Sequence, residues 1–223
     1  MYIQHKLMQM NTTELKIHLT KLKSEIPENH AIRLHRAISW LQCADKYSKE
    51  LDLQFISLWI SFNSCYAIPP DKDNSATEKE RFGSFVAQLI RHDAEKRFYN
   101  LLWQKFSSTV RLLLENEYLY KPFWDYQRGE IKEWRLVFQK SLENSLKYLS
   151  NQQVPELLEV VLDRLYTLRN QLIHGGATYN SKINRQQLID GCKMLQLMIP
   201  IIIEIMLSHP NDKWGEISYP VII

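Results

Sequence analysis

Apolar residues recur every three or four positions along almost the whole chain. That spacing places them on one face of an α-helix, and no segment alternates as a half-buried strand over more than four residues. The pattern therefore predicts an all-α protein. The expected helices begin at Thr12 or Thr13 and then occupy about 31–47, 53–67, 76–117, 130–149, 155–174 and 183–208.

Proline and glycine mark the ends of several of these helices. A Pro-Pro pair stops the segment 53–67, which is apolar nearly all round and is therefore expected at the centre of the fold. Pro155 suits the first turn of its helix, and Gly175 and Gly176 suit the end of the same helix. Residues 122–129 are expected to form a break that is rich in aromatic side chains.

Composition narrows the class of protein. The 223 residues suffice for one generous domain, and 45% hydrophobic with 24% charged residues exclude wholesale disorder. Only 6 glycines and 8 prolines argue against a many-turned β-sandwich. The formal net charge of +3 tolerates an anionic partner but is small for a dedicated nucleic-acid coat protein. We expect a single all-α domain over residues 1–223.

Cysteine and histidine usage points away from disulfide and metal chemistry. The three cysteines are far apart and form no Cys-x-x-Cys pair, so we expect reduced core thiols. His30, His35 and His92 lack metal-ligand spacing to a second histidine or cysteine on the same face. We therefore expect no metal and no cofactor.

No segment predicts export or membrane insertion. The first ten residues are polar and lack the apolar stretch of a secretory signal. The longest apolar run, 195–207, contains Pro200, which predicts a kink, and Glu204, and it is too short to span a bilayer. We expect a soluble, cytoplasmic protein.

The segment 165–175 carries the candidate chemistry. On a helical wheel that starts at Leu158, Arg169 falls about 20° away, in the middle of an apolar stripe. A guanidinium there needs a carboxylate, a symmetry mate or an anionic ligand. A polar face about 140° away from Arg169 carries Asp163, Thr167, Asn170 and His174.

The spacing alone leaves two interpretations open. In the structural one, Arg169 bridges a buried glutamate and His174 caps the helix C-terminus, where an imidazolium is favourable. In the functional one, both residues meet a ligand. An arginine followed five residues later by a histidine arises often by chance, so the spacing does not choose between them.

The sequence context of this pair resembles a known family. Residues 169–174 (RNQLIH) close a long amphipathic helix and are similar to the Arg-x4–6-His motif of the HEPN superfamily, in which a polar residue such as Asn170 commonly follows the arginine. A second block, 33–41 (RLHRAISWL) with 53–66 (LQFISLWISFNSCY), resembles the first helices of a bacterial HEPN group. The middle region, about 71–152, matches no motif and is interpreted as a family-specific elaboration.

The resemblance implies a HEPN-like helical bundle with additional helices, which dimerises so that two Arg/His sets face each other. Many members are metal-independent ribonucleases of toxin–antitoxin, phage-defence or RNA-processing systems. By that analogy His174 is base or acid in attack by the RNA 2′-hydroxyl, Arg169 clamps the phosphate and Asn170 is an orienting partner. The implied partners are RNA, a second copy of the chain, and an antitoxin or a nucleotidyltransferase.

Three further residues are candidates for substrate contact. Arg33 and Arg36 lie on one side of their helix, where they could approach a phosphate. The alternative is that they keep the surface soluble or pair with Asp45 or Glu50. Asn63 is a polar group in an almost wholly apolar helix and must be hydrogen-bonded. It either buttresses the site or pins two helices together.

Three functions from different classes remain open. The first is a HEPN endoribonuclease, and the second is a non-catalytic HEPN module that binds RNA, a nucleotide or a protein. The third is a helical scaffold in which Arg169 and His174 are structural, although an arginine inside an apolar stripe is awkward for it. Binding and cleavage use the same residue types, so the sequence does not separate the first two.

Overall fold

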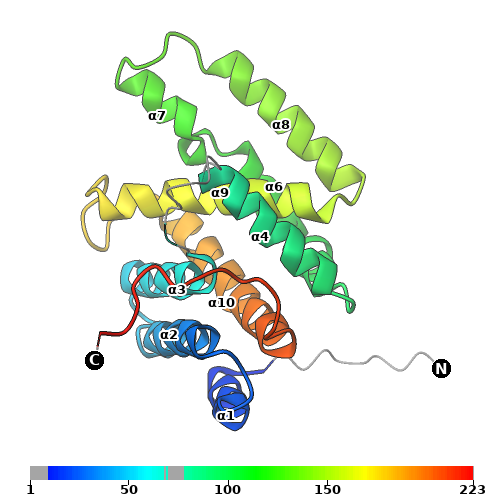
Figure 1. Cartoon of the computed structure of the whole chain (residues 1–223). Coiled ribbons are helices and arrows are strands. Elements are labelled where there is room, and N and C mark those ends of the chain that lie inside the picture. The colour runs from blue at the N-terminus through cyan, green and yellow to red at the C-terminus, as the bar shows by residue number, and fades with distance from the viewer. Residues whose placement is uncertain (1–9, 68, 70–77, 223) are drawn as a thin grey trace, which may run out of the picture.

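The computed structural model describes residues 10–67, 69 and 78–222 (Figure 1). Every regular element in these residues is helical, which confirms the all-α prediction. In chain order they are α1 (Thr12–Leu22), α2 (Glu28–Lys46), α3 (Leu51–Tyr66), α4 (Glu78–His92), α5 (Arg97–Tyr99), the π-helix η1 (Asn100–Lys105), α6 (Ser107–Glu115), the 3₁₀-helix η2 (Glu117–Leu119), α7 (Lys121–Gln127), α8 (Arg135–Ser150), α9 (Val154–Ile173) and α10 (Arg185–Ser208).

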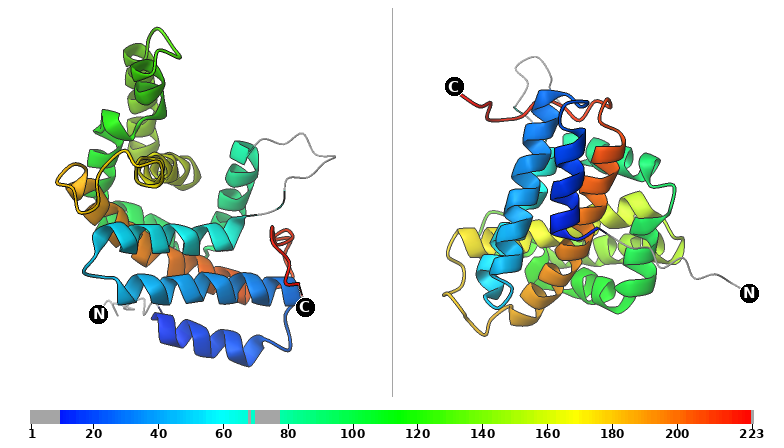
Figure 2. Two further views of the ribbon diagram at one scale, coloured as in Figure 1. Left: turned by 90° about the vertical axis from the view of Figure 1, so that its left-hand side faces the viewer. Right: turned by 90° about the horizontal axis from the view of Figure 1, so that it is seen from below.

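The first three helices form successive layers, which the left view of Figure 2 shows side-on. Helix α1 begins where the sequence predicted, because Asn11 caps it. The Asn11 side-chain oxygen accepts from the backbone N–H groups of Thr13 and Glu14, both at 3.0 Å, and the Glu14 carboxylate accepts from the Asn11 N–H at 2.7 Å. This reciprocal capping box satisfies donors that a helix start otherwise leaves unpaired.

Helix α3 is the central helix, as its all-round apolar sequence predicted. Phe55, Leu58, Phe62 and Cys65 are fully buried in it. Helix α10 packs closely against α3 at Gly191, where an added Cβ would lie 2.7 Å from a ring carbon of Phe55. The hydrophobic core is continuous and takes residues from α1 to α6, α9 and α10, while α8 packs against it with partly buried side chains.

Helix α9 lies across α3 and carries the candidate motif. It begins with a proline in its first turn, as predicted, and the tyrosine ring of Tyr166 meets the Trp59 ring of α3 at a centroid distance of 5.9 Å. In the left view of Figure 2, α9 is seen end-on, with α3 below it, α4 to one side, and α7 and α8 above.

The long helical region predicted for 76–117 is interrupted. The Asp93 carboxylate accepts from the Phe98 N–H at 2.8 Å, and Lys96 has a left-handed backbone with φ 54°. The side chain of an aspartate can bond to nearby backbone N–H groups in place of the helical backbone hydrogen bonds. The Asp93 side chain does so here, and α4 ends at the preceding residue, His92. A new helical segment then starts at Arg97.

The aromatic-rich break predicted for 122–129 is wrong, because most of it forms helix α7. Pro122 lies in the first turn of α7, where a proline fits a helix. It therefore marks the start of a helix and not a break between helices. Helix α8 starts later than predicted, at Arg135. The Glu133 carboxylate accepts from the backbone N–H groups of Trp134 and Arg135, which fixes that start.

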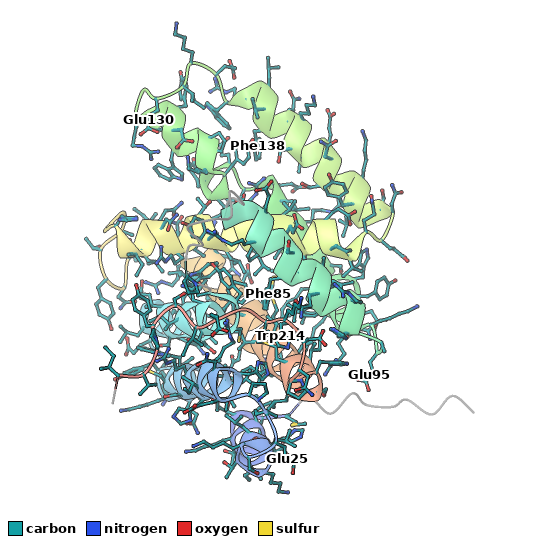
Figure 3. All side chains as sticks on the ribbon, in the orientation of Figure 1. Glu25, Phe85, Glu95, Glu130, Phe138 and Trp214 are labelled. Atoms are coloured by element: carbon teal, nitrogen blue, oxygen red, sulfur yellow. The ribbon has the colours of Figure 1, made fainter. Side chains whose placement is uncertain are left out.

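Helices α7 and α8 project from the rest of the molecule at the top of Figure 1. Aromatic rings hold their junction together: Phe138, labelled in Figure 3, lies 5.2 Å from the Tyr120 ring and 5.9 Å from the Trp134 ring. Phe123 contacts the Trp134 ring edge-to-face at 5.0 Å. These contacts place Tyr120 beside the outer face of α9.

Helix α10 is longer than the apolar run that marked it in the sequence. It is the one helix in the described part of the chain that is long and apolar enough to cross a membrane by length and composition. However, 72% of its most apolar window is buried inside the fold, which is typical of a core helix in a soluble protein. Its one acidic residue in the run 195–207, Glu204, pairs with Arg97 at 2.7 Å.

The segment after α10 runs back across the molecule, as the red trace in Figure 1 shows. Trp214 anchors it: its ring lies 6.1 Å from Phe85 of α4 and 6.3 Å from His30 of α2 (Figure 3). The Trp214 Nε1–H donates to the His209 carbonyl at 2.7 Å. The segment therefore ties α2, α4 and the end of α10 together.

Candidate functional site

The end of α9 is fixed by a Schellman motif, and this motif positions His174. The Gly176 N–H donates to the Gln171 carbonyl at 2.7 Å, and the Gly175 N–H donates to the Leu172 carbonyl at 3.2 Å. Gly175 has φ 70°, which a residue without Cβ adopts at little cost. His174 is the last residue before this turn, and its side chain is exposed.

Arg169 lies half-buried at the edge of the apolar stripe of α9. Its Nη1 donates to the Asn170 side-chain oxygen at 2.9 Å, and its guanidinium lies 5.9 Å from the centroid of the Tyr166 ring. No carboxylate among the side chains that the structure describes lies within 4.0 Å of it. The predicted bridge to a buried glutamate is therefore not formed among those residues.

The almost wholly buried arginine of α9 is Arg164, which the helical wheel did not single out. Its side chain is 1% exposed, and burial lowers its pKa. On the wheel that starts at Leu158, Arg164 lies outside the apolar stripe. Leu157 and Leu168 are also fully buried, and they extend the apolar arc to within about 20° of Arg164. With these two leucines included, Arg169 lies near the opposite edge of the arc and no longer in its middle.

The predicted polar face of α9 is only partly exposed. Asp163 and His174 reach solvent, but Thr167 is buried, and its hydroxyl donates to the Asp163 carbonyl at 3.2 Å. Threonine side chains commonly bond in this way to a carbonyl one turn earlier, so Thr167 needs no polar surroundings. The structure brings Arg169 and Asn170 into contact, while His174 is hydrogen-bonded to neither side chain among the described residues.

Helical geometry separates the two main candidate residues. Residues five apart on a helix point about 140° away from each other and are displaced by about 7.5 Å along the axis. Because His174 directly follows α9, its side chain still points about 140° away from that of Arg169. One chain therefore presents its guanidinium and its imidazole on different sides of the helix end.

The loop after α9 is held against the first turn of α3. Gln171 donates to the Tyr118 carbonyl at 2.5 Å, and Asn184 donates to the Gln171 side chain at 2.6 Å. Arg185 pairs with Asp52 at 3.0 Å. These bonds position the end of α9 from both sides, without using Arg169 or His174.

Arg33 does not have the position that was predicted for a phosphate contact. It is 1% exposed, and its two terminal nitrogens donate to four backbone carbonyls: those of Cys65 and Ala67 at 2.9 and 3.2 Å, and those of Gly215 and Glu216 at 2.8 and 2.9 Å. The guanidinium thus joins the end of α3 to the C-terminal segment. Its burial lowers its pKa.

Arg33 is also remote from the end of α9. It binds the last residues of α3, whereas the loop after α9 contacts the first turn of that helix. A helix of 16 residues is about 24 Å long. Arg36 is half-buried and has no ion pair in the described part of the chain, so its predicted phosphate contact stays a prediction.

Asn63 does not show the hydrogen bond that was expected. Its side-chain oxygen is buried and has no hydrogen-bond partner among the described residues. Burying a polar atom without a partner costs free energy. The Trp59 Nε1, one turn earlier in α3, is likewise buried without a hydrogen-bond partner among the described residues.

The described residues contain no group of three or more His, Cys, Asp or Glu side chains arranged to hold a metal. The three cysteines are free thiols, and burial raises the pKa of both Cys65 and Cys192 to about 12. A thiol with so high a pKa is a poor nucleophile at neutral pH.

Comparison with protein-family models, curated proteins and solved structures found no match to this chain.

Proposed function

We propose that this chain is a metal-independent endoribonuclease of the HEPN type, of the kind found in toxin–antitoxin and phage-defence systems, and that it acts in the cytoplasm. The observation that carries the proposal is the Arg169 guanidinium, which has no carboxylate partner among the described residues and is oriented by Asn170. The same helix end carries an exposed histidine, His174, five residues later in the chain. The resemblance of residues 169–174 (RNQLIH) to the Arg-x4–6-His motif supports the same assignment.

These residue types suit RNA cleavage by the substrate's own 2′-hydroxyl. His174 accepts the 2′-hydroxyl proton or protonates the leaving 5′-oxygen, because an imidazole is suited to both general-base and general-acid catalysis. Arg169 stabilises the additional negative charge on the phosphate oxygens with its forked donors. The products are then a 2′,3′-cyclic phosphate and a free 5′-hydroxyl.

The proposed enzyme is a homodimer with α9 near the twofold axis. The guanidinium and the imidazole of one chain point to different sides of the helix end, so one phosphate does not readily meet both. A twofold axis next to α9 would bring Arg169 of one copy towards His174 of the other. Each composite site would then contain both groups.

The test is cleavage of total RNA by purified protein in EDTA. We expect cleavage by wild type and cyclic-phosphate products, with loss of activity in His174→Ala. His35→Ala is the matched control, because His35 is an exposed histidine on α2. Loss of cleavage in EDTA that Mg²⁺ restores would contradict the metal-independent mechanism, and full activity in folded His174→Ala would remove the assignment to this site.

The second candidate is a non-catalytic HEPN module that binds RNA, a nucleotide or a protein partner such as an antitoxin or a nucleotidyltransferase. The separation of Arg169 and His174 on one chain favours it, since binding requires the guanidinium alone. It predicts RNA binding that Arg169→Ala weakens, with no cleavage under any of these conditions.

A further inference from the structure

Helices α2 and α3 lie side by side and present one open surface to the outside of the molecule. The Ser57 hydroxyl donates to the Cys43 sulfur at 3.5 Å, and the Ser61 hydroxyl donates to the Ala37 carbonyl at 2.7 Å. These bonds hold the two helices antiparallel, with Cys43 level with Ser57. The left view of Figure 2 looks onto this surface, where α2 and α3 run in front of α10.

Large apolar side chains reach solvent on this surface. Trp40 is 38% exposed, and Leu53 is 41% exposed. Each belongs to a stripe of residues that reach the surface and follow one another at intervals of three or four, so each stripe stays on one side of its helix. The two stripes, together called the α2–α3 face, are Arg36, Trp40, Cys43 and Tyr47 along α2 and at its end, and Leu53, Ile56 and Ile60 along α3.

The α2–α3 face lies on the side of α3 that points away from α10. Helix α10 packs against Phe55 at Gly191, and Phe55 points about 140° away from Ile60 around the axis of α3. Exposed aliphatic and aromatic side chains gathered on one face of a soluble domain mark an interaction surface.

Two opposite charges lie on either side of Cys43. Arg36 has no ion pair among the side chains that the structure describes, and it lies seven residues before Cys43, about 10.5 Å along the helix. Glu50 is exposed and lies seven residues after Cys43, in the turn between α2 and α3. Its carboxylate accepts from the Tyr179 hydroxyl and has a second oxygen that can accept from another donor.

This arrangement is complementary to itself under a twofold rotation. An axis that lies in the plane of the α2–α3 face and crosses α2 at Cys43 turns α2 of a second copy antiparallel to the first. Arg36 of each copy then lies opposite Glu50 of the other. The ion pair is impossible within one chain, because the two residues lie at opposite ends of α2, but it forms twice in such a dimer.

The apolar side chains match under the same rotation. Because Ser57 is level with Cys43, the axis crosses α3 near Ser57. Ile56 of one copy then lies beside Ile56 of the other, and Leu53 lies opposite Ile60. Apolar surface therefore meets apolar surface, and its removal from water favours association.

We propose that the α2–α3 face binds a second copy of this chain, with the twofold axis at Cys43 and with Arg36 of each copy paired with Glu50 of the other. A copy of the same chain is the partner because both the charges and the apolar stripe are self-complementary. The interface deepens the homodimer of the proposed function, on which its link to RNA cleavage rests.

The same dimer places the two ends of α9 next to each other. The loop after α9 is fixed beside the α2–α3 face, because Arg185 pairs with Asp52 at 3.0 Å and the Tyr179 hydroxyl donates to Glu50. Figure 1 shows the end of α9 on the same side of the molecule as α2 and α3. One interface therefore brings both helix ends towards the axis.

The first test is the dissociation constant of the dimer, measured by analytical ultracentrifugation on the full chain without RNA. Leu53→Lys should weaken the dimer about a hundredfold or more, because it buries an unpaired charge against Ile60 in two places. Leu112→Lys is the matched control, since Leu112 of α6 is 59% exposed and lies outside the α2–α3 face. It should leave the dissociation constant unchanged.

The second test exchanges the two charges. Arg36→Glu and Glu50→Arg should each weaken the dimer about tenfold to a hundredfold, because each places like charges opposite one another twice. The double variant Arg36→Glu with Glu50→Arg should restore most of the affinity. A loss in Glu50→Arg that came only from the broken Tyr179 contact would persist in the double variant, so the rescue identifies the ion pair.

The third test locates the axis. Cys65 and Cys192 are buried, so a short bismaleimide should react at Cys43 and link two chains of the native dimer. Cys43→Ser should abolish the linked product. Cys43→Ser with Thr20→Cys places the thiol on the exposed side of α1, and it should give no linked product either.

Four results would each overturn the proposal: a strict monomer at tens of micromolar, an unweakened dimer in folded Leu53→Lys, no rescue in the charge exchange, or a dimer that Cys43 does not link. The ribonuclease assignment is judged separately. A dimer with these properties that cleaves no RNA refutes only the ribonuclease. A chain that cleaves RNA and gives one of the four results refutes only the interface.

Discussion

Arg33 and Arg164 are both almost wholly buried, yet their guanidinium groups have different partners. Arg33 gives its terminal donors to four carbonyls from two distant segments. Arg164 stacks over Tyr120 and keeps two nitrogens without a partner among the described residues. The Nε of each guanidinium is buried without a hydrogen-bond partner among the described residues, so the difference lies in the terminal nitrogens. Those of Arg33 hold two distant segments together, which gives Arg33 a role in the fold.

Arg33→Ala should lower the free energy of unfolding by about 3–5 kcal/mol, because four carbonyls lose their donor and a cavity remains. Urea denaturation measures this. The folded fraction should still cleave RNA, since Arg33 bonds to the C-terminal end of α3, whereas the candidate site lies near the first turn of that helix. Wild-type stability in Arg33→Ala would contradict the structural role.

Arg36→Ala is the companion variant. Its side chain is half-buried without an ion pair among the described residues, so the free energy of unfolding should change by less than about 1 kcal/mol. If Arg36 contacts a phosphate as predicted, RNA affinity falls while stability stays constant. Unchanged affinity would assign Arg36 to the surface alone.

His174 and Arg169 should be separable by kinetics. His174→Ala should reduce the cleavage rate about 10²–10⁴-fold with little change in RNA affinity, because it removes proton transfer only. Arg169→Ala should reduce both rate and affinity, and Arg169→Lys should restore part of each, since an ammonium lacks the bidentate fork. A lower melting temperature as the sole effect of Arg169→Ala would instead indicate a structural residue.

At the scale of the element, the end of α9 sets where the imidazole lies. The Schellman bonds of Gly175 and Gly176 end the helix at Ile173, directly before His174, and Gln171 anchors the last turn to the Tyr118 carbonyl. The sequence signals for this end are local, which is why the glycine pair predicted it correctly. A change in this turn should therefore act on His174 without touching it.

Gly175→Ala should cost about 1–2 kcal/mol of stability, because an L-residue with φ 70° is strained, and it should also lower the cleavage rate. Gly129→Ala is the matched control: Gly129 has φ 77°, and a Cβ at either glycine would meet no atom within 4 Å. Both variants should therefore lose similar stability by thermal melting. Equal cleavage rates in the two would show that the turn does not position His174.

At the scale of the whole molecule, the proposed site is completed by a second copy. Light scattering at tens of micromolar should give the mass of a dimer, and a strict monomer would contradict the proposal. Mixing refolded or co-expressed Arg169→Ala and His174→Ala chains gives a sharper test. In a mixed dimer one composite site has lost both residues and the other keeps both.

Random mixing of these two inactive variants should therefore restore about one quarter of the wild-type activity, since half of the dimers contain one intact site out of two. Each variant mixed with itself should stay inactive. Absence of any recovery in a mixture that demonstrably forms mixed dimers would show that each site uses the Arg169 and His174 of one chain.

The elements were predictable wherever a local signal existed. The helix start at Thr12 or Thr13, the Pro155 start and the Gly175–Gly176 end all depend on signals within one or two turns, and the structure confirms them. The break predicted around Pro122 was wrong, because a proline can begin a helix as well as end one, and Pro122 lies in the first turn of α7. At the start of α8, the Glu133 carboxylate accepts from the backbone N–H groups of Trp134 and Arg135, and hydrophobic periodicity does not predict this contact.

The sequence by itself determined the all-helical class, the central position of α3 and the place where α9 ends, because spacing and capping are properties of neighbouring residues. The tertiary structure alone decided which arginines are buried and what they bind. The Arg33 partners lie up to 183 residues away along the chain. Arg164 is buried because Tyr120, from another element, covers it. The environment of a long charged side chain depends on packing between distant segments, and helical periodicity carries no information about it.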